Sequence, residues 1–282
     1  MLFADYALRH RVWFPTAALV ALLGEFGVTP GAARTTVNRL AHRGVVHRAK
    51  DGRRTSYRLT PPASTVLIAG GRRIAGFVGQ AEAWDNTWTL VAFTLPKERD
   101  ADRRTLRNRL RLLGYAPLFD GLWVSPQFMD KVTAETLSGA VSATVTVFRA
   151  RRVDLGAADR DPLEAWDLSG IAEEYADFIG HWTPLLGRLR AGALNGADAL
   201  RARTGVMDDY RRFPLLDPEV PLRLMPPGWP REEARNLFVA LYDGLADPAL
   251  EHVLRLVAAS GDAPVTGIGA YSVADLLTGI PS

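Results

Sequence analysis

Two adjacent helical segments, followed at once by a short hairpin, constrain the fold of this chain more than any other feature. Residues 16–26 place apolar side chains at helical spacing, and residues 30–42 form a second segment of helical length. Roughly four residues join the two segments, which is the spacing of a helix-turn-helix. We therefore expect this motif at the start of the chain.

The residues that flank these segments agree with two separate helices. Thr16 is placed to cap the first helix, and Gly27 is placed to end it. Thr29 and Pro30 supply a capping residue and a proline at the first position of the second helix. Gly44 is placed to close that helix, because glycine readily adopts the left-handed conformation that follows a helix end.

The second predicted helix has two chemically different sides. At about 100° per residue, Ala33, Val37 and Leu40 gather on an apolar side. The opposite side and its flanks carry side chains that can donate to base edges and phosphates, as a recognition helix in the major groove requires. These residues are Arg34, Thr35, Asn38, Arg39, His42 and Arg43. Taken alone, the pattern also fits the solvated face of an ordinary amphipathic helix.

The segment that follows favours the DNA-binding interpretation. Residues 45–49 and 55–59 have β-branched, alternating character, and Asp51-Gly52 between them is a strong hairpin signal, with Asp51 expected to form the turn. A hairpin directly after a recognition helix is the wing of a winged helix-turn-helix. Its tip and flanks carry cations suited to sugar and phosphate contacts. These cations are Arg48, Lys50, Arg53 and Arg54.

Positive charge is concentrated in the first quarter of the chain. Residues 1–75 hold 12 Lys and Arg against 3 Asp and Glu, a net charge of +9. Residues 76–282 hold 22 against 28, a net charge of −6, so the whole chain carries +3. A basic domain of this kind is typical of a protein that binds a polyanion, although a solubilising surface would also be basic. We expect the DNA-binding domain over residues 1–62 and a linker over residues 63–84.

Two segments of this first domain resemble the PaaX family. The first, from Arg34, runs Arg-Thr-Thr-Val-Asn-Arg-Leu-Ala-His-Arg-Gly-Val-Val. The second, from Gly52, runs Gly-Arg-Arg-Thr-Ser-Tyr-Arg-Leu-Thr and contains the family's wing motif Gly-Arg-Arg-x-x-Tyr-x-Leu intact. A family Gly-Trp-Leu after the recognition helix is replaced here by Gly44-Val45-Val46.

Members of this family are repressors of phenylacetate-degradation genes. The resemblance therefore implies a cytoplasmic repressor that binds a double-stranded DNA operator as a homodimer. It also implies a small-molecule effector, phenylacetyl-coenzyme A or another acyl-coenzyme A, and no cofactor. Effector binding must favour a conformation with poorer DNA affinity, because otherwise it could not relieve repression.

The middle of the chain changes to a mixed pattern, expected to form a domain over residues 85–150. A β-forming run at residues 87–95 precedes a basic amphipathic helix at 103–113. Two short strands, 116–119 and 122–125, flank Asp120-Gly121, and a helix at 126–137 precedes a strand at 143–149. The order βαββαβ predicts a ferredoxin-like domain.

The resemblance relates this domain to a small nuclease of CRISPR adaptation. Those nucleases carry an acidic residue at the end of the first strand, where this chain has Phe93-Thr94-Leu95-Pro96. We therefore expect no nuclease activity. The segment Trp84-Asp85-Asn86-Thr87-Trp88 is similar to the family's Trp-Asp-x-x-Trp, and its tryptophans are either packing anchors or ligand contacts.

Residues 151–282 are expected to form a mostly helical effector and dimerisation domain, which makes the protein a multidomain α+β chain. Ser169 is placed to cap a helix that runs past residue 182, and further helices are expected at 196–212, 231–245 and 248–259. The proline-rich segments 210–222 and 227–230 resemble the family's C-terminal signature. The tail after residue 259 does not obviously match the family.

Six residues near the start of this region are candidates for the effector site. Arg149, Arg151 and Arg152 follow or end the last central strand and could meet coenzyme phosphates, although a surface cluster is the alternative. An aromatic series at helical spacing could line a pocket for an aryl group, with core packing as the alternative. This series is Tyr175, Phe178 and Trp182.

The sequence offers little support for an enzyme or a metalloprotein. There is no cysteine, the five histidines are scattered, and no zinc-protease motif, phosphate-binding loop or nucleophile elbow is present. A signal peptide is not expected, because Asp5 precedes the apolar residues 12–24 and Pro15 interrupts them. Two alternatives remain: a nucleic-acid-processing enzyme built on the ferredoxin-like domain, and a protein-interaction module with an incidental basic arm.

Overall fold

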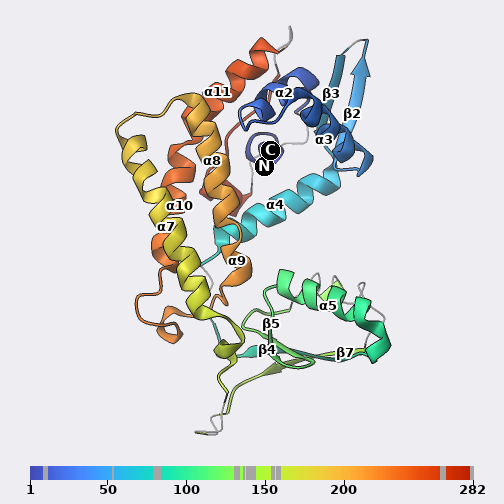
Figure 1. Ribbon diagram of the computed structural model, residues 1–282, viewed down its shortest axis with the longest axis vertical. Coiled ribbons are helices and arrows are strands. Elements are labelled where there is room, and N and C mark those ends of the chain that lie inside the picture. Colours follow the sequence, from blue (N-terminus) through green and yellow to red (C-terminus); the bar gives the residue numbers. More distant parts are fainter. Residues whose placement is uncertain are drawn as a thin grey trace. The chain divides into compact units, whose positions relative to one another are not determined.

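The computed structural model describes residues 1–8, 12–52, 54–78, 84–129, 134–135, 137, 144–153, 156, 160–260 and 265–279 (Figure 1). The chain forms two compact units. The first unit consists of Met1–Gly76, Phe178–Tyr210 and Glu233–Ser282. The second unit consists of Phe77–Asp177 and Arg211–Glu232. The helical region that follows residue 151 therefore contributes to both units, rather than to one.

The winged helix-turn-helix begins the first unit. Its elements are α1 (Leu2–Tyr6), β1 (Phe14–Pro15), α2 (Thr16–Gly24), α3 (Pro30–His42), β2 (Val46–Asp51) and β3 (Arg54–Leu59). The three strands form an antiparallel sheet in the order β1-β3-β2, and α2 packs against α3. The predicted helices and hairpin are confirmed, whereas α1 and β1 were not expected. Strand β1 has only two residues, and Phe14 pairs with Tyr57 of β3.

The limits of α2 differ from the sequence expectation. Thr16 does not cap the helix, because it is the first helical residue and its hydroxyl donates to the carbonyl of Thr55, 2.7 Å away. The bond attaches the start of α2 to the wing. The helix ends at Gly24 rather than at residue 26, and the turn that follows includes Gly27 with φ of +75°. Thr29 accepts from the Ala32 amide at 3.4 Å and caps α3 as predicted.

Asp51 does not form the wing turn that the sequence predicts for it. It is the last residue of β2 and pairs with Arg54 of β3. Gly52 has φ of +56°, which glycine adopts without the steric cost that a side chain imposes. The hairpin itself is as predicted.

Helix α4 (Pro61–Gly76) occupies most of the predicted linker. Thr60 precedes the helix and caps it, because its hydroxyl accepts from the Ala63 amide at 3.4 Å; the same hydroxyl donates to the Gly44 carbonyl at 2.8 Å. The same residue thus joins the end of the recognition helix to the start of α4. Helix α4 packs against α12 (Val273–Thr278), where Gly71 lies beside Leu276. The tail after residue 259 therefore belongs to the first unit.

Four longer helices complete the first unit, two of them in part. They are residues 178–190 of α7 (Leu168–Arg190), α8 (Gly196–Tyr210), residues 233–244 of α10 (Arg231–Gly244) and α11 (Ala246–Ala259). Helix α8 packs against α11, and α11 also contacts α2. The first unit thus holds the DNA-binding motif and a helical bundle that touches it. Helix α8 ends at Tyr210, two residues before its predicted end.

A buried arginine is bonded to separate segments of the first unit. Arg203 of α8 is fully buried, and its guanidinium donates to the carbonyls of Tyr242 (3.1 Å) and Tyr271 (2.6 Å). The Tyr242 hydroxyl donates to Asp5 of α1 at 3.1 Å. Burial raises the pKa of Asp5, and the charge of Arg203 opposes that rise. These contacts fix α1, α8 and α10 against one another.

The central sheet of the second unit has the ferredoxin-like order. Its elements are β4 (Trp88–Thr94), a short 3₁₀ turn (Lys97–Arg99), α5 (Asp100–Leu112), β5 (Ala116–Phe119), β6 (Leu122–Ser125) and β7 (Thr144–Ala150). The strands run antiparallel in the order β5-β6-β4-β7. Helix α5 covers one face of the sheet (Figure 1), where Leu106 and Leu110 pack against Val91 and Trp123.

The second helix of this domain begins later than predicted. Residues 126–129 are not helical, Ala134, Glu135 and Leu137 are helical, and residues 130–133 lie outside the described residues. Two hydrogen bonds hold the segment after β6 in another conformation. The Ser125 hydroxyl accepts from the Gln127 amide at 3.2 Å, and the Gln127 carbonyl accepts from Thr89 at 2.6 Å.

The second unit also contains short helical turns and the first part of α7. The turns are Pro162–Ala165, α9 (Phe213–Leu216) and Leu222–Leu224. Helix α7 is capped by Asp167, which accepts from the Gly170 amide at 3.0 Å, so the expectation that Ser169 caps it is wrong. The Ser169 hydroxyl instead donates to the same carboxylate at 2.9 Å. Asp167, rather than Ser169, caps the helix because its carboxylate accepts both bonds at once.

A buried ion pair organises the centre of the second unit. The Asp217 carboxylate accepts from Arg231, and both side chains are fully buried. It also accepts from the Tyr175 hydroxyl and from the Trp229 indole, each at 2.9 Å. Burying two charges is stable only when further hydrogen bonds satisfy them, and these two neighbours supply such bonds.

Across the described parts of the chain, every helix is too short or too polar to cross a membrane.

Candidate nucleic-acid interface

The two sides of the recognition helix lie as the sequence predicts. Ala33 and Val37 are 0% and 3% exposed and face the core against α2. The six polar candidates on the other side and its flanks are all exposed. They are Arg34, Thr35, Asn38, Arg39, His42 and Arg43. Helix α3 therefore presents a continuous polar surface that holds three arginines and no acid.

The pairing of the wing strands decides which way its cations face. Arg48 pairs with Tyr57 and Lys50 pairs with Thr55, so Arg48 and Lys50 share the sheet face of Tyr57. Arg54 pairs with Asp51 and lies on the opposite face. Arg48, Lys50 and Arg54 are exposed. The fourth candidate of the wing, Arg53, lies outside the described residues.

A hydrogen bond joins the recognition helix to the wing. The Tyr57 hydroxyl donates to Oδ1 of Asn38 at 2.8 Å, and the ring of Tyr57 is only 3% exposed. This contact orients the Asn38 amide so that its NH₂ group remains the end that can donate elsewhere. It also places the face with Arg48 and Lys50 beside α3. The sequence motif identifies Tyr57 only as the tyrosine of the wing and does not predict its contact with Asn38.

The opposite face of the wing is supported by an aromatic residue. The guanidinium of Arg58 lies 4.7 Å from the ring centre of Trp13, a cation–π contact. Alternation along β3 places Arg58 on the side away from Tyr57. Arg58 therefore differs from the exposed wing cations, because its charge is already held by an aromatic ring.

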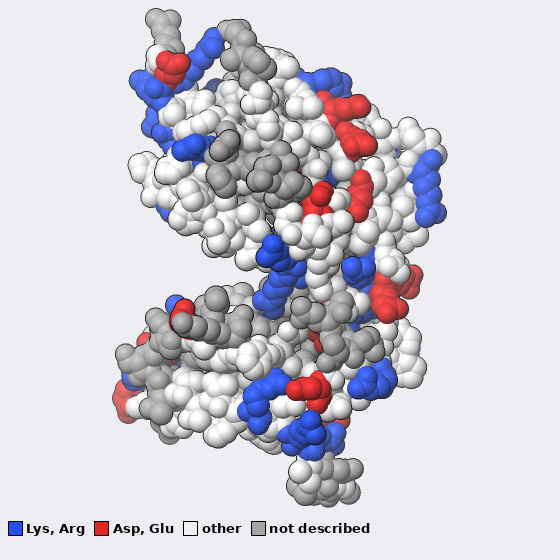
Figure 2. Space-filling view, turned by 180° about the vertical axis from the view of Figure 1, so that it is seen from behind, with Lys and Arg blue, Asp and Glu red and all other residues white. Residues whose placement is uncertain are grey.

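The basic residues gather on one part of the first unit. In the space-filling view, Lys and Arg lie along the β2–β3 hairpin (Figure 2), which also carries the exposed Asp51. The exposed side of α3 adds Arg34, Arg39 and Arg43 to the same domain. Such a surface can bind the phosphates of DNA while a helix enters the major groove.

Two of the three arginines proposed for the effector contact acids of the second unit. Arg149 lies 3.0 Å from Asp85, and Arg152 lies 2.7 Å from Asp161, while Arg151 is exposed. Burial acts to raise the pKa of Asp85, but hydrogen bonds from Thr87 and the Arg149 guanidinium hold it below its ordinary value. A phosphate at Arg149 or Arg152 would therefore compete with a carboxylate.

The aromatic effector candidates are mostly core residues. Tyr175 is fully buried in the second unit and stacks on Phe213, with ring centres 4.1 Å apart. Phe178 is 4% exposed in the first unit and packs near Tyr210. Trp182 is 8% exposed, but it lines a cavity of the first unit. The burial of Tyr175 and Phe178 agrees with the core-packing alternative.

The tryptophans before the central sheet have packing contacts. Trp84 and Trp88 meet edge to face, with ring centres 5.0 Å apart, and Trp88 also lies near Trp166. The Trp84 indole donates to the Thr87 carbonyl at 2.9 Å. These contacts favour the interpretation of the segment as an anchor.

The fold and its basic face define a winged helix-turn-helix protein with a ferredoxin-like central sheet and a helical C-terminal part. Three family models match consecutive segments of the chain. Residues 1–63 match the PaaX-like protein model, residues 81–161 match the PaaX protein central Cas2-like domain, and residues 166–255 match the PaaX-like protein C-terminal domain. The chain belongs to the PaaX family of transcriptional repressors.

Comparisons with individual proteins agree with this assignment. The chain is 29% identical over 274 residues to the transcriptional repressor PaaX of Escherichia coli (strain K12), covering 93% of this chain and 84% of that protein. The solved structure of the uncharacterized protein Rv0674 from Mycobacterium tuberculosis is similar in fold, with a TM-score of 0.51 and 23% identity. The match covers 89% of this chain and 93% of that one. Family membership confirms the expectation of a regulator rather than an enzyme.

Proposed function

We propose that the protein represses an aromatic catabolic operon of the phenylacetate type and leaves its operator when it binds an acyl-coenzyme A. The observation that carries the proposal is the exposed basic face that α3 and the wing share. A homodimer would place two recognition helices on a partly palindromic operator. The Escherichia coli relative is named a transcriptional repressor, which supports the repressor part of the proposal.

The candidate residues divide into two roles in the proposed complex. Residues in the first turns of α3 are proposed to read base edges, where Arg commonly contacts guanine and Asn commonly contacts adenine. These are Arg34, Thr35, Asn38 and Arg39, with His42 and Arg43 further along the helix. The wing cations are proposed to contact sugars and phosphates. These are Arg48, Lys50, Arg53 and Arg54.

The effector part of the proposal is supported by cationic and aromatic side chains. Arg149, Arg151 and Arg152 remain candidates for coenzyme phosphates, in competition with the carboxylates of Asp85 and Asp161. Among the aromatic candidates, Tyr175 and Phe178 would need to leave a packed core to meet a ligand. Trp182 already lines a cavity and is the better placed of the three.

Fluorescence anisotropy against the protein's own promoter DNA tests the proposal directly. Titrations at about 0.15 M salt, with and without excess nonspecific duplex, separate specific from electrostatic binding. Tight binding that resists the competitor, and that phenylacetyl-coenzyme A weakens, supports the proposal. Weak binding that the competitor removes would favour an interaction module with a basic arm. Tight binding without a response to the acyl-coenzyme A would leave a repressor with another effector.

A further inference from the structure

An open cavity of about 410 Å³ lies between α7 and α8 in the first unit. This volume is within the range of about 300–1,000 Å³ that small-molecule sites occupy. Its lining includes apolar side chains, the indole of Trp182 and two arginines. The residues that matter most are His181, Trp182, Leu185, Arg188, Leu194 and Arg201. The lining combines an aromatic surface with cations, so it suits a ligand that has an apolar part and an anionic part.

The charged residues that line the cavity can attract an anionic ligand. The carboxylate of Asp198, which lines the cavity, already has two partners: it accepts from the Asn195 amide group at 3.0 Å and lies 2.6 Å from Arg201. Arg188 approaches Asp198 only to 4.0 Å, and its side chain is 56% exposed. The guanidinium of Arg188 can therefore turn to a phosphate or carboxylate at little cost, and such contacts are strong and often bidentate.

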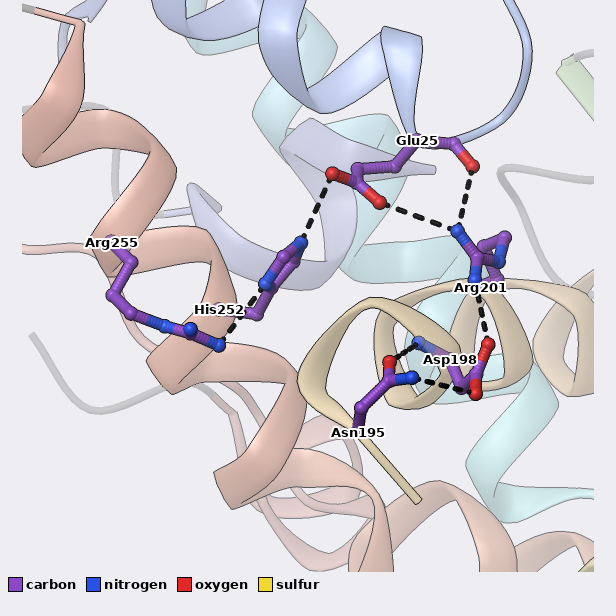
Figure 3. Close-up of polar contacts among 6 residues, drawn as sticks. All are labelled: Glu25, Asn195, Asp198, Arg201, His252 and Arg255. Atoms are coloured by element: carbon purple, nitrogen blue, oxygen red, sulfur yellow. Dashed lines mark hydrogen bonds and ion pairs between the residues drawn. The ribbon is translucent and has the colours of Figure 1, made fainter.

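Arg201 connects the cavity to the helix-turn-helix. Its Nη1 atom lies 3.3 Å from both the backbone carbonyl and the carboxylate of Glu25, the C-cap residue that follows α2 (Figure 3). Cations are favourable at this end of a helix, because its last carbonyls have no partner within the helix. His252 of α11 lies 3.2 Å from the other carboxylate oxygen of Glu25. Helix α2 is thus held at its end by the bundle that forms the cavity.

We infer that this cavity, rather than the cluster of Arg149, Arg151 and Arg152, binds the effector, an anionic ligand with an apolar acyl group, and that the ligand takes Arg201 away from Glu25. The inference rests on the proposed function, because it assigns the site through which the DNA-binding motif is regulated. The contacts of Arg201 with Glu25 are long, at 3.3 Å, beside the 2.6 Å contact with Asp198. The Glu25 contacts are therefore the first that a competing anion breaks.

Release of Glu25 would reach the recognition helix through α2, which packs directly against α3. A ligand that binds better when the Glu25 contact is broken must favour the state in which that contact is absent. By reciprocity, DNA that favours the clamped state weakens ligand binding by the same factor. This regulation requires a shift of the end of α2 and no rearrangement of the whole first unit.

The ligand site is tested first without DNA. Calorimetric titration of the full-length protein with phenylacetyl-coenzyme A is compared for the wild type, Arg188→Ala, Arg188→Lys and Arg190→Ala. Loss of the Arg188 charge should weaken binding about tenfold, since a hydrogen bond to a charged group contributes that much affinity. Arg188→Lys should restore part of it. Arg190 is exposed on the same helix but does not line the cavity, so Arg190→Ala should bind as the wild type does.

The connection to DNA is tested with Glu25→Gln, which removes the charge but keeps the size of the side chain. This variant should bind phenylacetyl-coenzyme A more tightly, because the competing carboxylate is gone. In operator titrations it should lose most of the ligand response, which for the wild type is expected to be at least about fivefold. Thermal unfolding of each variant establishes that it is folded.

The outcomes separate the inference from the proposed function. A wild type that binds none of phenylacetyl-coenzyme A, phenylacetate or coenzyme A overturns the inference, even if operator binding is tight. Ligand binding that Arg188→Ala leaves unchanged places the effector elsewhere. A Glu25→Gln variant that responds to ligand as the wild type does overturns the role of Arg201. Ligand binding that depends on Arg188, without operator binding, overturns the proposed function and leaves the site standing.

Discussion

Arg39 and Arg54 are both exposed cations of the DNA-binding domain, but their positions predict different effects on binding. Arg54→Ala removes a wing charge, so it should weaken binding to every sequence similarly and lower the salt slope by about one. Arg39→Ala removes a recognition-helix donor and should cost about 1–3 kcal/mol for the operator alone. Anisotropy titrations at several salt concentrations, with operator and unrelated duplex, measure both effects. The same loss of specificity from both variants would contradict the division of roles.

The hydrogen bond between Tyr57 and Asn38 leads to a prediction for the substitution of Tyr57. Tyr57→Phe keeps the buried ring but removes the hydroxyl that holds the Asn38 amide. The free energy of unfolding should fall by about 0.5–1.5 kcal/mol. The ratio of operator to nonspecific affinity should also fall, because the Asn38 amide is no longer oriented. Urea denaturation and competition anisotropy measure the two quantities. An unchanged ratio would mean that Asn38 takes no part in base recognition.

A partly buried glutamate of the second unit makes stability depend on pH. Glu219 accepts from the Val78 amide at 3.2 Å and from Gln127 at 2.7 Å, and burial raises its pKa above the ordinary 4.5. The folded state therefore favours the protonated form of Glu219. This preference adds to the free energy of unfolding at low pH, and the contribution is lost as the pH rises through the raised pKa. Glu219→Gln should unfold at a higher temperature than the wild type at pH 7. The advantage should shrink below pH 4.5, and an advantage that does not change with pH would contradict the argument.

The residues of the candidate interface were predictable only where the signal is local. The exposed face of α3 follows from helical periodicity, because neighbours on a helix surface are three or four residues apart. The contact of Tyr57 with Asn38 joins strand to helix and has no sequence signature. Arg201 and Glu25 are 176 positions apart, so only the packing of the bundle brings them together.

Thr60 illustrates how one residue can join two elements. Its hydroxyl caps α4 and also donates to the carbonyl of Gly44 at the end of the recognition helix. Thr60→Ala should lower the free energy of unfolding by about 0.5–2 kcal/mol, as other capping losses do. Thr60→Ser keeps the hydroxyl and should lose much less. Chemical denaturation compares the pair, and equal losses would show that the methyl group, not the hydroxyl, stabilises this junction.

The elements that could be predicted are those with signals within their own sequence. Helix α3 has a cap, a proline at its start and a glycine after its end, and the β5–β6 hairpin has Asp120-Gly121. Gly121 has φ of +78°, and a Cβ there would lie 2.8 Å from the Phe93 carbonyl. Strand β1 and helices α1 and α12 are short and depend on distant partners, because elements of this length are marginal alone. Their existence is a property of the packed unit.

Charge is distributed over the whole molecule in a way that would orient it on DNA. Residues 1–75 carry +9, and the remainder of the chain carries −6. The basic domain is attracted to the phosphates, while the acidic remainder is repelled, so encounters that present the winged helix are favoured. At physiological salt this selection acts only within about 8 Å of the surface. This electrostatic selection therefore guides the final approach of the protein to DNA and does not by itself determine which DNA sequence is bound.

The proposed homodimer gives a prediction about the spacing of the operator. Two recognition helices related by twofold symmetry reach half-sites whose centres are about 10–10.5 base pairs apart, or a multiple of that, on one face of the duplex. Insertion of about 5 base pairs between the half-sites turns one to the opposite face, so affinity should fall to nearly that of a single half-site. Insertion of about 10 base pairs returns the half-site to the same face, and affinity should recover in part if the dimer can extend. Anisotropy with the three duplexes, and sedimentation velocity for the oligomeric state, measure the two halves of the argument. Equal affinity for all three duplexes would show that each protomer binds DNA independently.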